Sequence, residues 1–146
     1  MLNSDKIYYQ EKKLGGILCE SKIKKDAIDK IVIGVGINVN ETIEEHPDDL
    51  QKSITTMFSI TKHAHQRELI VAEFINSFER LLKKLNDKPT SIIDEWLNYC
   101  LHLNKKVSFS NDKQLDEGTF IGLNEKGYAQ IEINGEVKTY NSINLI

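Results

Sequence analysis

Two glycine-bearing segments near the start of this chain of 146 residues have the composition of a binding site. Residues 12–20 read KKLGGILCE, and residues 32–40 read VIGVGINVN. Glycine weakens a strand, so glycines in two apolar strands indicate that a ligand or another backbone approaches closely. Lys13 stands at the entrance of the first segment, and Asn38 and Asn40 stand at the exit of the second. The pair predicts the floor of a pocket for a flat, anionic ligand.

Each of these residues also has an ordinary structural explanation. Lys13 could present its ammonium to a phosphate or a carboxylate, or it could be a solvated lysine that ends a hairpin. Residues 34–36 (GVG) lack the third glycine and the following helix of a dinucleotide fingerprint, so the two glycines could instead accommodate a crossing helix. Asn38 and Asn40 could hydrogen-bond the edge of a base, or they could start a loop.

Other kinds of catalytic or metal site find little support. His63 and His65 are two residues apart, but no acidic or cysteine ligand follows at a spacing typical of a metal site, so no metal site is predicted. The sequence contains no nucleophile elbow, Walker loop or HExxH motif. The residues alone therefore predict a ligand-binding α+β domain with a small barrel.

Composition limits the partners and the cellular location. The net charge of −3 gives no electrostatic footprint for DNA or RNA. No apolar run approaches the roughly 20 residues that cross a bilayer. The N-terminus lacks the basic start and apolar core of a secretory signal. We therefore expect a cytoplasmic protein that binds neither nucleic acid nor membrane.

The first half of the chain predicts three strands. Residues 6–10 and 13–21 form a hairpin, and residues 22–29 form a charged connector. Residues 30–38 are a nearly continuous β-branched run, which is typical of a strand covered on both faces. Residues 40–49 are polar and predict a loop.

Two helices follow. Apolar residues recur at steps of three and four between positions 65 and 85, which predicts an amphipathic helix. A second helix begins near Thr90 or Ser91, either of which could serve as the N-cap. Trp96 on this helix is expected to be a packing anchor.

The C-terminal segment predicts five short strands and hence a small barrel. Asn134-Gly135 lies between two alternating segments, which is the strongest short signal for a two-residue hairpin turn. The chain is expected to change from one domain to the other near Leu103-Asn104. This gives domains over residues 1–103 and 104–146.

The glycine-bearing segments resemble motifs of one enzyme family. Residues 12–20 resemble the KKLaGILvE strand of biotin protein ligases, and residues 34–40 (GVGINVN) resemble their GiGiNvN strand. The long helix, the helix with Trp96 and residues 118–127 (GTFIGLNEKG) resemble the rest of the family's C-terminal half. The resemblance covers essentially the whole chain. It implies part of a mixed-sheet, class II synthetase-like ligase domain followed by a small SH3-like β-barrel.

The resemblance also implies an activity. Biotin protein ligases join the carboxylate of biotin to the α-phosphate of Mg²⁺-bound ATP and then transfer biotin from biotinyl-5′-adenylate to a lysine of a carrier domain, typically in acetyl-CoA carboxylase. Lys13 is implied as the lysine that touches the biotin carboxylate and the phosphate. Asn38 is implied to read the edge of adenine. The implied floor of the biotin and adenylate site consists of Gly15, Gly16, Leu18, Gly34 and Gly36.

The chain departs from the family in two places. Family members carry WPND before the first glycine strand, but residues 3–6 read NSDK here, with Lys6 where an aspartate is expected. The N-terminal half of the family's catalytic domain, with its GRGRxxR-type loop, has no counterpart in the chain. Arg67 and Arg80 lie on the predicted long helix and cannot replace that loop.

A half-domain is expected to be incomplete as a catalyst and to associate with other chains, because uncovered strand edges and apolar faces tend to pair. We therefore expect a fragment of a biotin ligase that is completed by a second polypeptide, and a homo-oligomer. The alternatives are a non-catalytic remnant, a self-associating interaction module, or a barrel that binds proteins unrelated to biotin.

Overall fold

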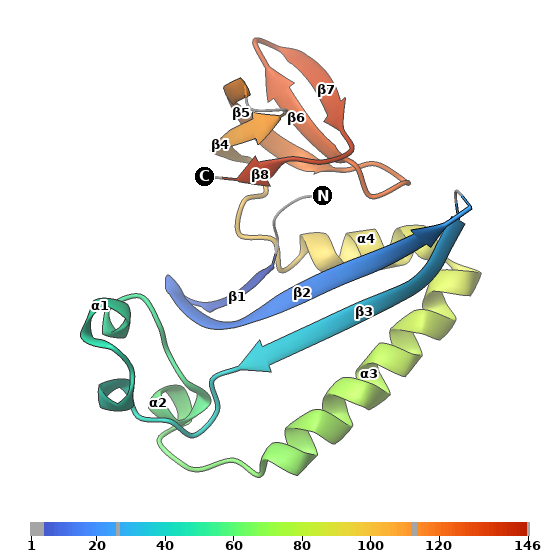
Figure 1. Ribbon diagram of the computed structural model, residues 1–146. Coiled ribbons are helices and arrows are strands. Elements are labelled where there is room, and N and C mark those ends of the chain that lie inside the picture. The colour runs from blue at the N-terminus through green and yellow to red at the C-terminus, as the bar shows by residue number, and fades with distance from the viewer. Residues whose placement is uncertain (1–4, 26, 112–113, 146) are drawn as a thin grey trace. The chain divides into compact units, whose positions relative to one another are not determined.

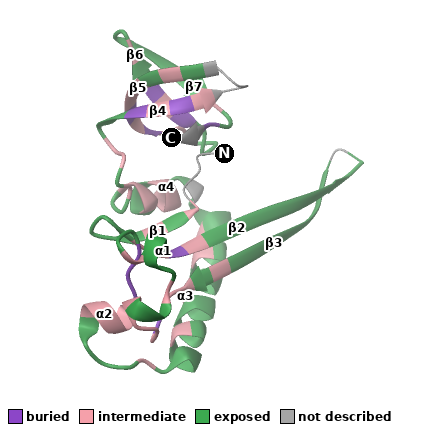
Figure 2. Cartoon of the chain, turned by 60° about the vertical axis from the view of Figure 1, so that its left-hand side comes forward, coloured by how far each residue is buried: buried purple, intermediate pink, exposed green. Residues whose placement is uncertain are grey.

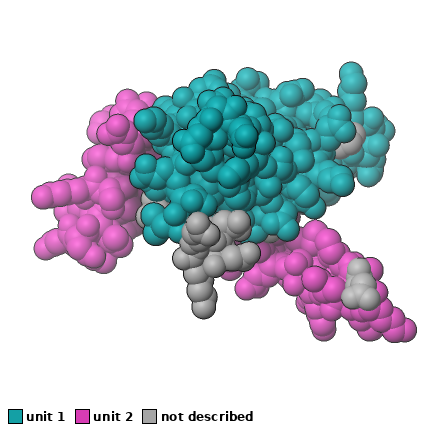
Figure 3. All heavy atoms as spheres, turned by 90° about the horizontal axis from the view of Figure 1, so that it is seen from above, with its two compact units in different colours: residues 1–3, 73–146 teal, residues 4–72 magenta. Residues whose placement is uncertain are grey.

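A computed structural model describes residues 5–25, 27–111 and 114–145 (Figure 1). The chain forms two compact units, coloured separately in Figure 3. One unit is Ser4–Ala72, and the other contains Glu73–Ile146. The two units meet between Ala72 and Glu73, inside a long helix. This division does not test the predicted domain boundary near Leu103-Asn104, which stays a prediction. Each unit is described by itself.

The N-terminal unit is built on a three-stranded antiparallel sheet, and its three strands are those that the sequence predicts. Its strands are β1 (Lys6–Tyr9), β2 (Lys12–Lys24) and β3 (Ala27–Ile37), in the order β1-β2-β3. The short strand β1 pairs only with residues 12–16 of β2. The remainder of β2 and β3 is a two-stranded ribbon, which Figure 1 shows as a long extension.

Two expectations about this ribbon are wrong. Residues 22–29 are not a connector, because Ile23 pairs with Ile28 and the chain turns at Lys25, which has a φ of 51°. A β3 covered on both faces is also not observed, since Ile31 is 54% exposed and Val32 is 49% exposed. Figure 2 shows most of β3 in the colour of exposed residues. A β-branched run favours extended backbone whether or not a second layer covers it, so the pattern predicts the strand but not its burial.

Short helices follow β3. The predicted loop at residues 40–49 contains the 3₁₀ helix η1 (Ile43–Glu45) and the start of α1 (Asp48–Gln51). Helix α2 (Met57–Thr61) is capped by Thr56, whose hydroxyl accepts a hydrogen bond of 3.0 Å from the Ser59 amide. Val39 and Ile54, each 7% exposed, form the apolar centre of this region.

The two predicted helices are confirmed as α3 (Arg67–Asp87) and α4 (Pro89–Leu97). The predicted N-cap of α4 is wrong, because Lys88 occupies that position and makes no capping hydrogen bond through its side chain. Proline suits the first helical position because it lacks an N–H that would otherwise be unpaired there. No helix within the described ranges is long and apolar enough to cross a membrane.

The C-terminal unit contains the five strands that the sequence predicts, all antiparallel. The sheet has the order β7-β6-β5-β4-β8, with strands β4 (Lys105–Asn111), β5 (Gln114–Leu123), β6 (Ala129–Ile133), β7 (Glu136–Tyr140) and β8 (Asn144–Leu145). Asn134 and Gly135 have φ values of 54° and 84°, so both occupy the left-handed region of a type I′ hairpin turn. The outer strands β7 and β8 do not pair with each other in the described residues, and closure into a barrel stays a prediction.

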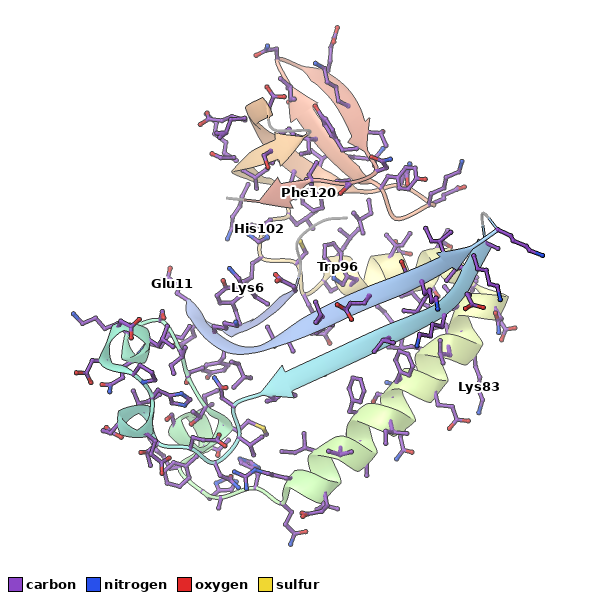
Figure 4. All side chains as sticks on the ribbon, in the orientation of Figure 1. Lys6, Glu11, Lys83, Trp96, His102 and Phe120 are labelled. Carbon is purple, nitrogen blue, oxygen red and sulfur yellow. The ribbon has the colours of Figure 1, made fainter. Side chains whose placement is uncertain are left out.

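The sheet of the C-terminal unit encloses an apolar core. Phe109, Phe120 and Ile131 are 0% exposed. Trp96 packs against this core, and its ring meets that of Phe120 edge to face at a centroid distance of 6.4 Å (Figure 4). The expectation that Trp96 is a packing anchor is confirmed, and α4 is joined to the sheet within this unit.

Truncating Phe120 should therefore destabilise the C-terminal unit. We expect Phe120→Ala to lower the free energy of unfolding by about 3–5 kcal/mol, because a buried ring is replaced by a cavity. Urea unfolding followed by circular dichroism measures this difference. The control is Val137→Ala on the edge strand β7, which removes a 53% exposed side chain and should change the free energy by less than about 0.5 kcal/mol. Equal losses for both variants would contradict this account of the core.

Candidate functional site

The register of β2 and β3 brings the predicted glycines together. Gly16 is the direct partner of Gly36, and Leu18 is the partner of Gly34. Cross-strand partners and residues two apart share one face of a sheet. Gly16, Leu18, Gly34 and Gly36 therefore form one surface, which we call the glycine face. Gly15 pairs with Ile37 and belongs to the opposite face.

A β-bulge places Lys13 on the glycine face. Regular alternation would point Lys13 and Gly16 in opposite directions, because they are three residues apart. The pairing of β1 with β2 shifts between Ile7–Gly15 and Tyr8–Lys13, which leaves Leu14 as an extra residue. A Cβ built on Gly16 would accordingly lie 3.7 Å from Cε and 3.9 Å from Nζ of Lys13. The cation thus lies beside Gly16 on the glycine face.

The backbone of Lys13 is held by a segment from elsewhere in the unit. Its amide donates a hydrogen bond of 2.8 Å to the carbonyl of Ser53, and its carbonyl accepts one of 2.8 Å from the amide of Thr55. This makes a parallel bridge between Lys13 and Ile54, just beyond the point where β3 ends. The backbone from which the half-buried lysine side chain extends is therefore fixed.

The glycines are required for two different reasons. A Cβ on Gly15 would lie only 2.4 Å from the carbonyl oxygen of Gly36, so a side chain there would collide with backbone. A Cβ on Gly16 would lie 3.1 Å from the carbonyl oxygen of Asp5. A Cβ on Gly36, in contrast, would meet nothing within 4 Å. Packing explains Gly15, whereas Gly36 leaves open space on the glycine face.

The two asparagines after β3 bind neighbouring loops. Nδ2 of Asn38 donates a hydrogen bond of 3.0 Å to the carbonyl of Thr55. Asn40 and the backbone of His65 exchange two hydrogen bonds of 2.8 Å. Both side chains thus have structural roles, and the reading of adenine by Asn38 stays a prediction.

Glu41 closes the same loop through a charged carboxylate. Its Oε2 accepts a hydrogen bond of 2.8 Å from the amide of Val39, and its Oε1 lies 3.1 Å from the guanidinium of Arg67. The hydrogen bond from its own amide is the largest cause that lowers the pKa of Glu41. Burial opposes this effect, and Arg67 and the amide of Val39 lower the pKa further. The carboxylate therefore stays ionised and keeps the chain after β3 attached to the start of α3.

Sequence reasoning missed two residues beside Lys13. The carbonyl of Asp5 accepts a hydrogen bond from the amide of Ile17, and the side-chain Oδ1 of Asp5 is buried without a hydrogen-bond partner among the described residues. The family motif has an aspartate at the position of Lys6, and Asp5 stands one position earlier. An alignment that permits a shift of one residue would have matched Asp5 to that aspartate. No sequence motif marks Thr55, because its role depends on the hydrogen bond from its backbone amide to the carbonyl of Lys13.

The described residues offer no group of three His, Cys, Asp or Glu side chains that could hold a metal ion. The rings of His63 and His65 are 4.8 Å apart, and Nε2 of His65 lies 2.8 Å from the hydroxyl of Thr61. These contacts give the histidines a structural role at the end of α2. The absence of a metal site in the whole chain stays a prediction.

The two classes of glycine should respond differently to alanine. We expect Gly15→Ala to lower the free energy of unfolding by about 1–3 kcal/mol, because the added methyl group forces β2 and β3 apart. Gly36→Ala, its matched control on the partner strand, should leave this free energy unchanged or slightly raise it. Chemical unfolding of both variants tests the difference, and a more damaging Gly36→Ala would refute the assignment of open space.

Comparisons with known proteins agree with the motifs. No family model matches the chain. The chain is 24% identical over 135 residues to the bifunctional ligase/repressor BirA of Bacillus subtilis and, equally, to that of Bacillus spizizenii. Each alignment covers 92% of this chain but 42% of the relative, so the chain spans about two fifths of the curated relatives' length.

Solved structures extend the similarity to the fold. The apo biotin protein ligase from Aquifex aeolicus superposes with a TM-score of 0.81 at 28% identity and covers 100% of this chain and 64% of that structure. The same enzyme in complex with biotin and ATP gives a TM-score of 0.80 at 28% identity, with 100% and 61% coverage. Lys13, the paired glycines and the fold around them thus occur together in a chain that is a homologue of biotin protein ligases over nearly its whole length.

Proposed function

We propose that this chain contributes the lysine-bearing part of a site that activates biotin with ATP and transfers it to a protein lysine. The observation that carries the proposal is the position of Nζ of Lys13, 3.9 Å from the Cβ position of Gly16. A cation beside a surface made mainly of glycines suits a flat ligand that carries an acyl phosphate. Two relatives whose names describe them as ligases, and one structure of a biotin protein ligase in complex with biotin and ATP, support it.

The reaction has two steps. An oxygen of the biotin carboxylate attacks the α-phosphorus of ATP, the bond from that phosphorus to the bridging oxygen breaks, and pyrophosphate leaves. The product is biotinyl-5′-adenylate. The amine of an acceptor lysine then attacks the acyl carbon, loses a proton and forms an amide, while AMP leaves.

Lys13 supplies positive charge to both steps. Negative charge accumulates on the phosphoryl oxygens during the first attack, and a fixed cation stabilises that charge most where water is excluded. The glycine face lets the ligand lie close to the backbone, and the 63% exposed side chain of Leu18 offers apolar contact to the biotin rings. Asn38 is proposed to meet the adenine edge through the part of its amide that does not hold Thr55.

Magnesium enters this proposal with the nucleotide. The ion neutralises phosphate charge when it arrives bound to ATP. The described residues contain no three-ligand cluster that fits a resident metal, although the buried Oδ1 of Asp5 lacks a partner. We therefore treat Mg²⁺ as part of the substrate, and the residues of this chain act on the ligand directly.

The site needs residues beyond this chain. The curated relatives are more than twice as long as the aligned region, and a Gly-Arg-rich loop is implied by the family resemblance. We propose that a second polypeptide, or further sequence of the same protein, supplies that loop and completes a class II synthetase-like domain. The C-terminal sheet is proposed to act as an SH3-like barrel that helps to bind the biotin carrier domain of acetyl-CoA carboxylase.

The ribbon of β2 and β3 supports self-association. Its exposed apolar side chains include Ile23 at 67%, Ile28 at 62% and Ile31 at 54% exposed. An isolated two-stranded ribbon is marginal in water. A non-catalytic, self-associating remnant is the second candidate function, because such a surface requires no intact active site.

Calorimetry with biotinyl-5′-adenylate tests the site. We expect the chain to bind this compound more tightly than biotin or ATP alone, and Lys13→Met to weaken binding at least about tenfold, because a hydrogen bond to a charged group is lost. Lys12→Met is the matched control, since adjacent strand residues point to opposite faces. Binding that survives Lys13→Met, or no heat at millimolar ligand, would favour the remnant.

Sedimentation tests the oligomer. We expect the chain to sediment as a species larger than a monomer, and the double variant Ile23→Thr/Ile28→Thr to shift it toward the monomer. Threonine keeps the β-branched shape that strands prefer while it removes apolar surface. A wild-type monomer that binds no apolar dye would exclude self-association through this ribbon.

A further inference from the structure

A recess of about 570 Å³ lies in the N-terminal unit, apart from the glycine face. Its walls come from the β1–β2 hairpin, from residues 42–44 and from residues 55–62. Ligand pockets commonly have volumes of roughly 300–1,000 Å³. The recess is therefore large enough for a small molecule, and none of the residues proposed above to contact biotin or ATP lines it.

The recess lies on the other face of the strand from Lys13. Tyr9 and Lys12 are cross-strand partners and both line the recess, whereas the next pair, Tyr8 and Lys13, does not. Adjacent residues of a strand point to opposite faces. Because Lys13 points over Gly16, Lys12 points away from the glycine face. A ligand in the recess would thus be separated from the glycine face by the sheet.

The walls combine apolar and cationic groups. Phe58, Ile43 and Ile60 are half-buried, and Tyr9 adds an aromatic ring that is 45% exposed. The charged residues of the lining are Lys12, Lys62 and Glu44. None of these three forms an ion pair with another described residue, so the recess has a formal excess of one positive charge. Gln10, Thr42 and Ser59 also line the recess, so its walls are mixed and not mainly apolar. Apolar side chains beside surplus positive charge favour a ligand that has both an apolar body and an anionic group.

Thr55 supplies an unused polar group. The residue is 6% exposed and lines the recess. Its amide and carbonyl are bonded to Lys13 and Asn38, but its hydroxyl makes no hydrogen bond to any described residue. A bound ligand with an anionic oxygen would satisfy this hydroxyl as a donor.

The backbone at Lys62 adds to this picture. Lys62 ends α2 with a φ of 64°, in the left-handed region that glycine occupies most readily. A lysine in this conformation is strained relative to glycine.

We propose that this recess is a second binding site, which takes a small ligand with a ring-sized apolar body and one anionic group, a carboxylate or a phosphate. Phe58 and its apolar neighbours contact the body of the ligand. Lys12 and Lys62 attract the anion, and the hydroxyl of Thr55 donates to it. The proposal is independent of biotin ligation, because it uses none of the residues on the glycine face.

Titration of the ¹⁵N-labelled chain with phenylacetate and phenyl phosphate tests the site and distinguishes the two anions. We expect saturable amide shifts at residues 42–44 and 55–62. Benzyl alcohol lacks the charge, phenethylamine reverses it, and acetate and inorganic phosphate lack the ring. These four compounds should bind more weakly at the same residues than the better aromatic anion does.

Variants separate the contacts. Lys12→Met and Lys62→Met should each weaken binding roughly two- to fivefold, as expected for exposed charges. Thr55→Val should weaken it about tenfold without lowering the stability of the fold, because the hydroxyl has no described partner to lose. Two controls should leave binding unchanged: Lys52→Met, which removes an exposed lysine outside the recess, and Lys13→Met, which changes the glycine face.

Several outcomes would overturn the proposal. The first is that neither phenylacetate nor phenyl phosphate gives saturable shifts. The second is that phenethylamine binds as tightly as the aromatic anions. The third is that Lys12→Met, Lys62→Met and Thr55→Val all leave binding unchanged. A loss of binding with Lys13→Met would also overturn it, since the probes would then occupy the glycine face. Failure of biotinyl-5′-adenylate to bind leaves this test unaffected, so the two proposals can fail separately.

Discussion

The candidate site depends on one close backbone approach. At Gly15 the strands β2 and β3 come so near that a methyl group would lie 2.4 Å from the carbonyl oxygen of Gly36. This approach belongs to a register in which Gly16 faces Gly36 and Gly34 faces Leu18. A slip of one residue would move every side chain to the other face, and would bring bulky residues such as Ile17 and Val35 onto the glycine face. The three glycines therefore share one surface only in the observed register.

The position of the cation depends on a second local irregularity. Without the extra residue Leu14, Lys13 would point away from Gly16. The bulge is stabilised from outside β2, because Ser53 and Thr55 hold the backbone of Lys13 and Asn38 holds Thr55. The placement of one ammonium group therefore requires β1, the end of β3 and the segment around Ile54. This segment lies about forty residues after Lys13 in the sequence, roughly a quarter of the chain length. All of these lie in one unit.

Local signals predicted most of the elements. Glycine pairs in apolar strands, the Asn134-Gly135 turn and the helical spacing of apolar residues all act through near neighbours, and the corresponding elements are present. The contacts that orient Lys13 could not be predicted in this way, since a bulge and a bridge to Ile54 depend on pairing across the chain. The prediction of a connector at residues 22–29 failed for a different reason. Lysines on an exposed ribbon are solvated, so a charged composition does not exclude a strand.

The electrostatics of the glycine face explain why this chain needs further residues for the proposed reaction. Around the Cβ positions of Gly16, Gly34 and Gly36, the nearest described atoms within 4 Å include one charged group, the amine of Lys13. Phosphoryl transfer develops charge on several oxygens at once and is stabilised by several donors and cations. One lysine with an open surface above it can bind one side of an acyl phosphate. The opposite side requires groups that approach from above the sheet, and the openness of the glycine face leaves them room.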